Sequence, residues 1–519
     1  MPRRFNVAGP CKPEFHYMLP AAARVPQARR LVADFNYFVI HAPRQTGKTT
    51  SMIELAQQLT ASGEYVAVLV SVEVGAAFND DPGAAELAIL SEWQRASEVR
   101  LPPGLQPPAW PSAEPGARIA RALHAWAQAA PRPLVIFIDE IDALQNATLI
   151  SVLRQLRAGY NDRPTGFPAS LALIGMRDVR DYKVAAGGSE RLNTASPFNI
   201  KARSMTLGSF TRDDVAALYQ QHTADIGQVF QPTAIDHAFY LTQGQPWLVN
   251  DLAKTAIEEV LNDVPDPVTV AHIDAAKELL IQRQDTHLDS LAERLREARV
   301  RGVIEPILAG GSLDDVPQDD IRFVVDLGLC RFDGAGGLVI ANPIYHEVLP
   351  RVLAGGARAS LPHITPAWLK PDGSLDPDKL LAAFLAFWRQ HGQPLLGSVH
   401  YHEIAPHLVL MAFLHRVVNG HGTLDREYAI GTRRMDLCLR YGGRQPVTMG
   451  MELKVWREGE ADPLAEGLAQ LDEYLAGLGL EQGWLVIFDR RCGLPPIAQR
   501  THTEAAVSPA GRAITVIRA

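Results

Sequence analysis

The 519-residue sequence has few cysteines, no long apolar run and no excess of positive charge. The cysteines lie far apart and lack the CxxC spacing of a zinc site, so we expect free thiols in a reducing compartment at Cys11, Cys330, Cys438 and Cys492. No stretch of about 18 apolar residues occurs, which predicts that no segment spans a membrane. The basic start of the chain lacks the apolar core of a signal peptide. These absences favour a cytoplasmic protein.

The overall charge argues against extensive nucleic-acid binding but does not exclude a local nucleic-acid site. The formal net charge is −8 and the sequence pI is about 6.1, which excludes a protein coated in positive charge. A local nucleic-acid site stays open, because binding depends on where Lys and Arg are placed. At about 150 residues for each domain, the length predicts three or more folded units. The hydrophobic fraction of 47% is sufficient for each unit to have its own core.

The stretch "YFVIHAPRQTGKTTSMIELAQQL", residues 37–59, is the first to carry chemistry. Residues 37–40 form a short apolar run that is typical of a buried parallel strand. Apolar residues then recur at helical spacing from Met52, and Gly63 is a plausible helix stop. The run "YVAVLV" after it predicts a second strand. The order is that of a strand–loop–helix–strand unit.

The loop of this unit fits the phosphate-binding pattern GxxxxGK[ST] except at its first position, where Ala42 replaces Gly. Backbone N–H groups must turn toward the β-phosphate, and Gly47 permits that close approach. Lys48 can reach the β- and γ-phosphates, and the Thr49 hydroxyl can bind Mg²⁺. The alternative is a chance glycine turn before an ordinary helix. We predict a nucleotide-binding loop whose members are Ala42, Gln45, Thr46, Gly47, Lys48, Thr49 and Thr50.

A second apolar run, "PLVIFI", ends in Asp139 and Glu140. Acids at the carboxyl tip of a buried strand lie where α/β sheets bind ligands. We expect Asp139 to hold Mg²⁺ and Glu140 to orient or deprotonate the attacking water. An acidic turn after a core strand is the plainer interpretation. The strand "LALIGMR" ends in Arg177, which either senses the γ-phosphate or pairs with a nearby Asp on the surface.

Several segments together resemble the prokaryotic AAA-like P-loop ATPases of the STAND type: "HAPRQTGKTT", "VIFIDEID", "LIGMRDVRDYK", "SPFNI" and "TQGQPWLVNDLA". The resemblance covers roughly residues 1–355. It implies an ATP-dependent switch in which a helical lid and a winged helix follow the nucleotide domain. It also implies that Pro246, in the run Gly-Gln-Pro, touches the nucleotide. The missing first Gly and the lack of a clear arginine finger depart from the family pattern.

The middle of the chain predicts helices joined by irregular segments. The Pro-rich residues 101–116 predict an exposed loop, since proline excludes helix and inner strand. Residues 206–285 alternate helical runs with caps, including the start signal Thr-x-x-Asp in "SFTRDDVAALYQQH". Residues 286–355, beginning with a helix over 288–300, have a winged-helix outline without a basic recognition helix, which favours packing over DNA contact. Residues 356–375 are rich in Gly and Pro and predict a linker.

Beyond the linker the pattern changes to two helices and a hairpin. The strands "RRMDLCLRY" and "VTMGMELKVW" flank the turn "GGRQP". With the hairpin centred near Arg444, Asp436 lies opposite Glu452, and opposed residues share a face within about 5.5 Å. Lys454 lies two residues from Glu452 on the same strand and shares that face. The sequence predicts that the three side chains converge.

Two adjacent carboxylates repel unless a cation lies between them, and hard oxygen ligands suit Mg²⁺ or Mn²⁺. We therefore predict a metal site at Asp436 and Glu452, with Lys454 positioned to stabilise charge on a phosphodiester. An exposed salt bridge between Asp436 and Lys454, worth at most about 1 kcal/mol, is the alternative.

This pattern resembles the PD-(D/E)XK nuclease superfamily over about residues 376–519. The resemblance adds Glu403 as an early helix Glu, although a solvated helix start also favours Glu. Gln470 and Tyr474, four apart on a later helix, match a fourth motif of several members or simply line the helix–sheet interface. The run "WLVIFD" is expected to be the final strand.

The predicted fold is α/β: a P-loop parallel sheet (1–205), a helical lid (206–285), a winged helix (286–355), a linker (356–375) and a restriction-endonuclease-like domain (376–519). The predicted function is an ATP-hydrolysing switch that controls a Mg²⁺-dependent DNA endonuclease. One alternative is a signalling ATPase whose C-terminal domain only binds nucleic acid or protein. Another is an ATPase that assembles as a homo-oligomeric scaffold.

Overall fold

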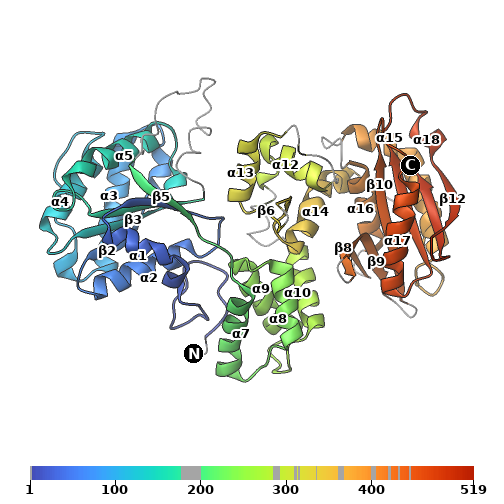
Figure 1. Ribbon diagram of the computed structural model, residues 1–519, viewed down its shortest axis with the longest axis horizontal. Helices are drawn as coiled ribbons and strands as arrows, with labels where there is room; N and C mark the ends of the chain where they lie inside the picture. The colour runs from blue at the N-terminus through green and yellow to red at the C-terminus, as the bar shows by residue number, and fades with distance from the viewer. Residues whose placement is uncertain are drawn as a thin grey trace. The chain divides into compact units, whose positions relative to one another are not determined.

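The protein is described by a computed structural model that covers residues 3–176, 200–283, 291, 293–308, 313, 316–334, 336–360, 367–398, 405–418, 422–430, 433–442 and 446–519. The chain forms two compact units. One contains Met1–Arg283 and Ile321–Arg331, and the other contains Gln284–Asp320 and Phe332–Ala519. Each unit has its own sheet (Figure 1). Within the described ranges, no helix is long and apolar enough to cross a bilayer.

The sheet of the first unit has five parallel strands in the order β2–β3–β4–β1–β5. Their bounds are β1 (Tyr37–His41), β2 (Val66–Ser71), β3 (Leu134–Asp139), β4 (Ser170–Gly175) and β5 (Lys201–Thr206). The predicted strands at 37–40, 65–70, 133–138 and 171–177 are confirmed to within two residues at each end. Strands β3 and β4 are buried along their whole length, which explains their continuous apolar sequences.

Helices cover both faces of this sheet (Figure 1). One face packs against α1 (Pro26–Ala33) and α2 (Lys48–Ala61). The other packs against α3 (Pro82–Arg100), α4 (Arg118–Ala129) and α5 (Asn146–Ala158). Alternate strand residues serve the two cores: Phe38 and Ile40 face the first pair, and Tyr37 and Val39 face the second group. The sheet therefore lies between two helical layers, which confirms the predicted α/β class for this unit.

The prediction of an exposed loop over residues 101–116 is wrong for part of that segment. It contains no α-helix or strand, as its prolines require, but Leu101 is buried and Trp110 packs on the core. The Trp110 ring lies 5.9 Å from that of Trp126, and its indole N–H donates to Leu90 O. Buried Glu86 accepts a backbone hydrogen bond from Gly116. Trp110 and the buried carboxylate of Glu86 thus hold residues 101–116 against the core, although composition alone predicts an exposed loop.

Four helices follow the parallel sheet: α7 (Arg212–Ile226), α8 (Pro232–Thr242), α9 (Pro246–Thr255) and α10 (Val270–Arg283). The predicted start signal is confirmed, because Thr211 and Asp214 form a capping box at the start of α7. The Thr211 hydroxyl accepts the Asp214 N–H at 3.1 Å, and the Asp214 carboxylate accepts the Thr211 N–H at 2.8 Å. We call the segment 207–211, between β5 and α7, the hinge.

The next elements are α12 (Ala298–Leu308), α13 (Gln318–Asp326), β6 (Cys330–Phe332), β7 (Leu338–Ile340) and α14 (Pro343–Ser360). Strands β6 and β7 form a two-stranded sheet. The predicted helix over 288–300 is wrong in its extent, because a turn at residues 295–297 precedes α12. The predicted linker over 356–375 also differs, since α14 continues to Ser360 and buried Trp368 packs on Phe413 with 5.9 Å between ring centroids. The winged-helix assignment stays a prediction.

The second unit contains a six-stranded sheet in the order β12–β13–β11–β10–β9–β8. Its strands are β8 (Gly422–Ile430), β9 (Arg433–Tyr441), β10 (Val447–Trp456), β11 (Gln482–Asp489), β12 (His502–Val507) and β13 (Ala513–Arg518). The helices in this part of the chain are α15 (Pro377–Ser398), α16 (Ala405–Val418), α17 (Leu464–Leu478) and α18 (Ile497–Arg500). The prediction that "WLVIFD" is the last strand is wrong, because β12 and β13 follow it and β13 pairs with it in parallel.

Helix α17 covers one face of this sheet, and α15 and α16 cover the other. Leu471 and Leu475 of α17 pack on Leu485 and Ile487 of β11. The next residue of β11, Phe488, faces the opposite side, where its ring lies 5.2 Å from Trp388 of α15 and 5.5 Å from His407 of α16. The alternation along β11 therefore defines the two faces, and the residues of β10 beside Leu485 and Ile487 belong to the α17 face.

Candidate functional sites

The loop between β1 and α2 has the backbone of an anion cradle. Gln45 and Gly47 have φ values of 58° and 88°, in the left-handed region, and α2 begins at Lys48. Left-handed residues before a helix start turn successive N–H groups toward one point, which is the condition for holding a phosphate. Ala42 is fully buried and its N–H donates to Gly175 O at 3.3 Å, as a continuation of β1. A small side chain is tolerated there, because this position does not take a left-handed conformation.

Lys48 lies folded back over this loop. Its ammonium group donates to Ala42 O at 2.7 Å and to Pro43 O at 2.8 Å. Burial lowers the pKa of Lys48, and the nearby carboxylates of Asp139 and Asp142 oppose that effect. Two carbonyl oxygens satisfy the charge only partly, so a phosphate is a stronger partner for the same group.

Thr49 and Asp139 bring the two predicted motifs together. Thr49 Oγ1 donates to Asp139 Oδ2 at 2.7 Å, and the Glu140 N–H donates to Asp139 Oδ1 at 3.0 Å. Asp139 is 4% exposed, and this burial raises its pKa. A hydroxyl and a buried carboxylate at 2.7 Å are hard oxygen ligands of the kind that Mg²⁺ prefers, so the residues fit that ion.

Glu140 has the properties of a base beside this pair. Its φ is 58°, so the chain turns sharply after β3. Burial, together with the charges of Asp139 and Asp142, raises the pKa of Glu140 to about 7. A carboxylate whose pKa lies near neutrality accepts a proton from water more readily than one with an ordinary pKa. Arg177, the predicted sensor of the γ-phosphate, lies outside the described residues.

A pocket opens beside the loop and brings predicted residues from distant segments together. Gln45, Gly47 and Thr50 line it together with Pro246 at the start of α9. Its apolar walls are Leu19, Phe210, Leu218 and Trp247. Buried Thr46 lies behind this surface, where its hydroxyl donates to Pro43 O at 2.9 Å. Pro246 of the Gly-Gln-Pro run and residues of the phosphate loop therefore line one pocket. Contact between Pro246 and a nucleotide stays a prediction.

Gly244 explains the geometry of that run. Its φ is 72°, and a Cβ placed on it would lie 1.8 Å from Phe210 O. The Phe210 N–H donates to Gly244 O at 2.8 Å, so the two backbones are in direct contact. Only glycine permits this approach. The contact fixes Pro246 and the start of α9 relative to the hinge.

Sequence reasoning missed the N-terminal strap, which we define as residues 3–25. Arg3 forms an ion pair with Asp225 of α7 at 2.9 Å, and the Trp247 indole N–H donates to Val7 O at 2.9 Å. The Cys11 N–H donates to Thr50 Oγ1 at 3.1 Å, next to the phosphate loop. The available signal was a pair of aromatic residues, Phe5 and Tyr17, which are both buried and pack against each other.

A second segment packs on the loop from farther along the chain. A Cβ on Gly328 would lie 2.4 Å from Pro43 Cγ, and the Gly328 φ of 76° also requires glycine. His41 Nδ1 lies 3.8 Å from Asp326 Oδ1 in the same region. The turn after α13 therefore contacts the phosphate loop at Pro43.

In the second unit, the predicted hairpin register is confirmed. Strands β9 and β10 pair antiparallel from Tyr441–Val447 to Leu437–Met451, and the next position in this series places Asp436 beside Glu452. The Leu453 N–H donates to Asp436 Oδ2 at 2.7 Å, so the Asp436 carboxylate lies against β10.

Glu452 is the most unusual group in this region. It is 3% exposed, and its Oε2 has no hydrogen-bond partner among the described residues. Lys454 Nζ lies 3.3 Å from Glu452 Oε1. Burial, and then the charge of Asp436, raise the pKa of Glu452, whereas Lys454 opposes the shift. A buried carboxylate oxygen without a partner is costly, and a cation would relieve that cost.

Helix α17 completes the surroundings of Lys454. Its ammonium group donates to Gln470 Oε1 and to Glu466 Oε1, the latter at 3.3 Å. Gln470 Nε2 in turn donates to Glu466 Oε1 at 3.1 Å. Tyr474 is buried in the core between α17 and the sheet. Gln470 thus contacts the predicted site, and Tyr474 supports the helix. Glu403 lies outside the described residues.

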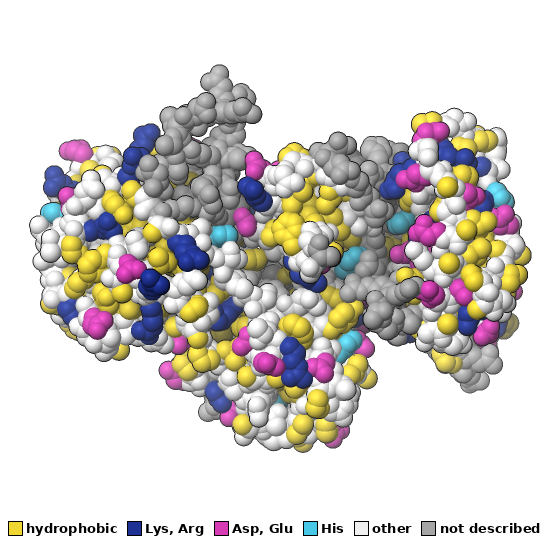
Figure 2. Space-filling model, viewed as in Figure 1, with side chains coloured by type: hydrophobic (Ala, Val, Ile, Leu, Met, Phe, Trp, Pro, Cys, Tyr) yellow, Lys and Arg dark blue, Asp and Glu magenta, His cyan; other side chains and the backbone are white. Residues whose placement is uncertain are grey.

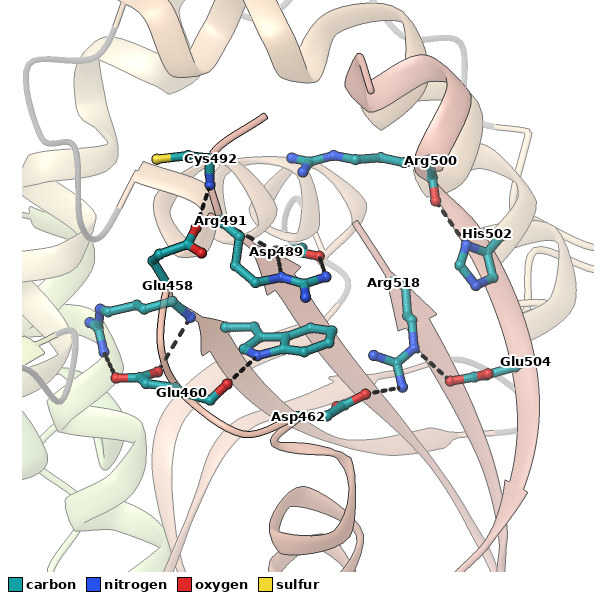
Figure 3. A network of polar contacts seen from close by, with 12 residues as sticks. Glu458, Glu460, Asp462, Asp489, Arg491, Cys492, Arg500, His502, Glu504 and Arg518 are labelled. Atoms are coloured by element: carbon teal, nitrogen blue, oxygen red, sulfur yellow. Dashed lines mark hydrogen bonds and ion pairs between the residues drawn. The ribbon is translucent and has the colours of Figure 1, made fainter. Parts of the chain in front are cut away.

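A network of polar contacts fixes the start of α17 (Figure 3). Asp462 accepts the Leu464 N–H at 3.0 Å and pairs with Arg518 of β13 at 2.9 Å. Glu458 accepts the Cys492 N–H at 3.0 Å. The Trp456 indole N–H donates to Glu460 O at 3.1 Å. This loop between β10 and α17 is therefore held to the neighbouring strand ends, which keeps Glu466 and Gln470 near Lys454.

The donor set fits a divalent ion only in part. Across the described ranges, no group of three or more His, Cys, Asp and Glu side chains is placed to hold a metal. Asp436 and Glu452 supply two carboxylates, and the buried Oε2 of Glu452 has no hydrogen-bond partner among the described residues. Two carboxylates completed by water and phosphate oxygens are a common way to bind Mg²⁺. The four cysteines are free thiols.

Comparisons with known proteins agree with the first site. Residues 36–182 match the AAA domain family. No curated protein matches the sequence. Among solved structures, the chain is similar to the Walker-type ATPase PABY2304 of Pyrococcus abyssi, with 12% identity, 66% of this chain and 99% of that chain covered, and a TM-score of 0.47.

Two further structures show looser likeness. The ORC2 protein of Aeropyrum pernix, solved as ADPNP–ADP complexes, has 15% identity, with 65% of this chain and 93% of that chain covered, and a TM-score of 0.37. The Holliday junction branch migration motor RuvB of Thermotoga maritima has 13% identity, with 63% and 92% covered, and a TM-score of 0.33. Structural similarities with TM-scores this low support no inference about function. The sequence match and the loop geometry together identify an ATP-binding, AAA-type P-loop ATPase domain in the N-terminal region.

Proposed function

We propose that this chain is an ATP-driven switch that controls a Mg²⁺-dependent DNA endonuclease in residues 376–519. The observation that carries the nuclease half is the meeting of Asp436, Glu452 and Lys454 on the α17 face, with a buried Glu452 oxygen that has no partner among the described residues. The ATPase half rests on the phosphate loop, the acidic pair and the pocket that joins them to Pro246.

In the first site, the apolar pocket walls suit the base and ribose, and the phosphate loop lies beside them. Lys48 would exchange its two carbonyl partners for phosphate oxygens. Thr49 and Asp139 would hold Mg²⁺, which when bound would neutralise charge on the phosphates. Glu140 would accept a proton from the attacking water at its carboxylate. Lys48 would thus bind phosphate, and Glu140 would accept the proton.

In the second site, Asp436 and Glu452 would hold Mg²⁺ or Mn²⁺, which when bound would act as a Lewis acid toward a phosphodiester. Lys454 would supply a positive charge to the same phosphate group. Glu466 and Gln470 accept hydrogen bonds from that ammonium group, so a substrate phosphate would compete with them.

DNA is the proposed substrate because the site is suited to a phosphodiester. Asp436 and Glu452 would hold a metal that binds the phosphate, and Lys454 would add a positive charge to the same group. The charges around the site are mixed. Figure 2 shows Lys and Arg interspersed with Asp and Glu over the described part of the visible face of this unit. Such a surface predicts binding through a few local phosphate contacts, with weak overall electrostatic attraction.

Plasmid cleavage tests the proposal. The full chain is incubated with supercoiled plasmid and Mg²⁺ or Mn²⁺, with and without ATP, and nicked and linear products are measured. We expect cleavage that depends on the metal and changes with ATP. Glu452→Ala should abolish it, whereas Glu481→Ala, an exposed carboxylate on the same unit, should leave it unchanged. Lys48→Ala should remove only the dependence on ATP.

Two alternatives correspond to other outcomes. Nucleotide binding without cleavage under any condition would favour a signalling ATPase whose C-terminal domain binds nucleic acid or protein, and would contradict the nuclease half. This alternative is favoured by one observation: the ammonium group of Lys454 already donates hydrogen bonds to Glu466 and Gln470. ATP-dependent assembly that survives Asp436→Ala would favour a homo-oligomeric scaffold.

A further inference from the structure

Arg24 occupies an unusual place in the first unit. It ends the short helix η1 (Ala21–Arg24) in the N-terminal strap, and it lines the pocket beside the phosphate loop. One guanidinium nitrogen, Nη1, donates to Thr46 O in the loop at 2.6 Å. The other, Nη2, donates to Gly208 O in the hinge. The guanidinium carbon also lies 4.8 Å from the centre of the Phe210 ring. One side chain thus joins the loop to the hinge.

The contact with Thr46 bears on the phosphate cradle itself. The carbonyl of Thr46 and the N–H of Gly47 belong to one planar trans peptide, so they point in opposite directions. A donor that holds the Thr46 carbonyl on one side therefore directs the Gly47 N–H to the other. In a phosphate loop of this pattern, that N–H is one of the groups that face the anion. Arg24 also lies so close that a Cβ on Gly47 would come within 2.9 Å of its Nη1.

The contacts with the hinge lead on to the far wall of the pocket. Gly208 and Phe210 lie between β5 and α7. The Phe210 backbone is in contact with Gly244, and Pro246 begins α9 two residues later. An unbroken series of direct contacts therefore runs from the loop peptide through Arg24 and the hinge to the Gly-Gln-Pro run. Both ends of the series line the pocket.

The geometry points to Arg24 as a positioning residue that couples occupancy of the phosphate loop to the conformation of the hinge and of helices α7 and α9. The inference rests on nucleotide binding by the P-loop domain. A phosphate that draws in the Gly47 N–H rotates the peptide whose carbonyl Arg24 holds, and the second nitrogen transmits that change to Gly208. Because such coupling is reciprocal, a displaced hinge would in turn weaken the cradle.

Arg24→Lys is the decisive variant, because lysine keeps the positive charge but cannot hold two carbonyls in a planar fork. The full chain is titrated with a fluorescent ATP analogue and Mg²⁺. Hydrogen exchange of residues 205–226 and 246–255 is then measured at saturating nucleotide. In the wild type we expect nucleotide to change exchange in both segments. In Arg24→Lys we expect binding weakened by about tenfold, from the loss of a charge-assisted hydrogen bond, and no nucleotide-dependent change in exchange.

Two further variants keep the test decisive. Arg30→Lys, at an exposed arginine of α1, is the matched control and should behave like the wild type. Phe210→Leu retains Arg24 but removes the ring beneath it, so it should reduce the exchange response even if Arg24→Lys folds poorly. An unchanged response in Arg24→Lys or Phe210→Leu at saturation would overturn the coupling. A wild type that binds nucleotide without any change in these segments would also overturn it. A wild type that binds no nucleotide would instead refute the proposed function.

Discussion

Thr49 Oγ1 donates a hydrogen bond of 2.7 Å to Asp139 Oδ2, across the carboxyl edge of the parallel sheet. The two residues are 90 positions apart in sequence, and each comes from a separate motif. Strand β1 leads through the phosphate loop to the start of α2, where Thr49 lies, and β3 ends on Asp139. Because β4 lies between these strands, the two motifs converge on the sheet edge without being neighbours in the sheet.

The first prediction concerns Asp139→Asn. Burial raises the pKa of Asp139, so its charge opposes folding at neutral pH. We expect the asparagine variant to melt at a higher temperature than the wild type without nucleotide, and to lose the Mg²⁺-dependent part of ATP binding. Differential scanning calorimetry and ATP titrations with and without Mg²⁺ measure the two effects. A variant that retained the full Mg²⁺ dependence would exclude Asp139 as a metal ligand.

The second prediction concerns the pH dependence of ATP turnover. The pKa of Glu140 is raised to about 7, so this carboxylate is protonated below neutral pH and cannot accept a proton from water. ATP hydrolysis should therefore rise as pH increases through about 7 and level off above it. Steady-state phosphate release from pH 5.5 to pH 9 measures the profile. Glu140→Gln should abolish turnover while retaining ATP binding, and Glu73→Gln is the control at a neighbouring acid. A flat profile would argue against Glu140 as the base.

The third prediction concerns Glu452 and stability. Its folded pKa is raised above the ordinary value of 4.5, so the folded state holds the proton more tightly than the unfolded state. The free energy of unfolding of the second unit should therefore fall as pH rises from 4.5 toward the raised pKa. Glu452→Gln removes this dependence and should be more stable than the wild type at neutral pH, by about 1 kcal/mol or more without metal.

Metal binding at the same site should have the opposite dependence on pH. A metal must displace the proton from Glu452, so Mn²⁺ should bind more tightly as pH rises, and Glu452→Gln should bind it weakly at every pH. Isothermal titration calorimetry at three pH values checks this. Tight Mn²⁺ binding by Glu452→Gln would place the metal elsewhere.

The fourth prediction compares two glycines with left-handed backbones. Gly244 has φ 72° and a Cβ there would strike Phe210 O, whereas Gly227 has φ 86° and open space around it. Gly227→Ala should cost about 1 kcal/mol, the strain of the backbone alone. Gly244→Ala should cost about 2–4 kcal/mol, because strain and a backbone clash combine. Chemical denaturation of both variants measures the difference, and equal losses would contradict the close approach at Gly244.

The sequence was most informative where periodicity and chemistry coincide. The buried strands, the phosphate loop and the register of Asp436 with Glu452 all follow from local patterns, since a strand alternates every two residues and a hairpin pairs residues symmetrically about its turn. Composition was less informative. The Pro-rich residues 101–116 are fixed by Trp110 and Glu86, and residues 367–376 are fixed by Trp368, in each case through contacts with distant helices.

The N-terminal strap shows the same limit at the site itself. Its role depends on Arg3, Val7 and Arg24 meeting α7, α9 and the loop, and these are contacts over about 20 to 240 positions in sequence. Local patterns carry no information about such partners. The last two strands were missed for a related reason, since β13 is defined by its pairing with β11 and β12, elements on either side of it in the sheet.

The packing of Gly328 on Pro43 has a practical consequence for dissecting this protein. Residues 321–331 belong to the nucleotide-binding unit, whereas residues 284–320 belong to the other, so the polypeptide passes between the units at three junctions: 283/284, 320/321 and 331/332. A fragment that ends at Arg283 would lack the segment that packs on Pro43, and a fragment that ends at Arg331 would include residues 284–320 of the second unit. Neither half can be excised whole by one cleavage, and limited digestion should release no active ATPase fragment that ends before residue 331.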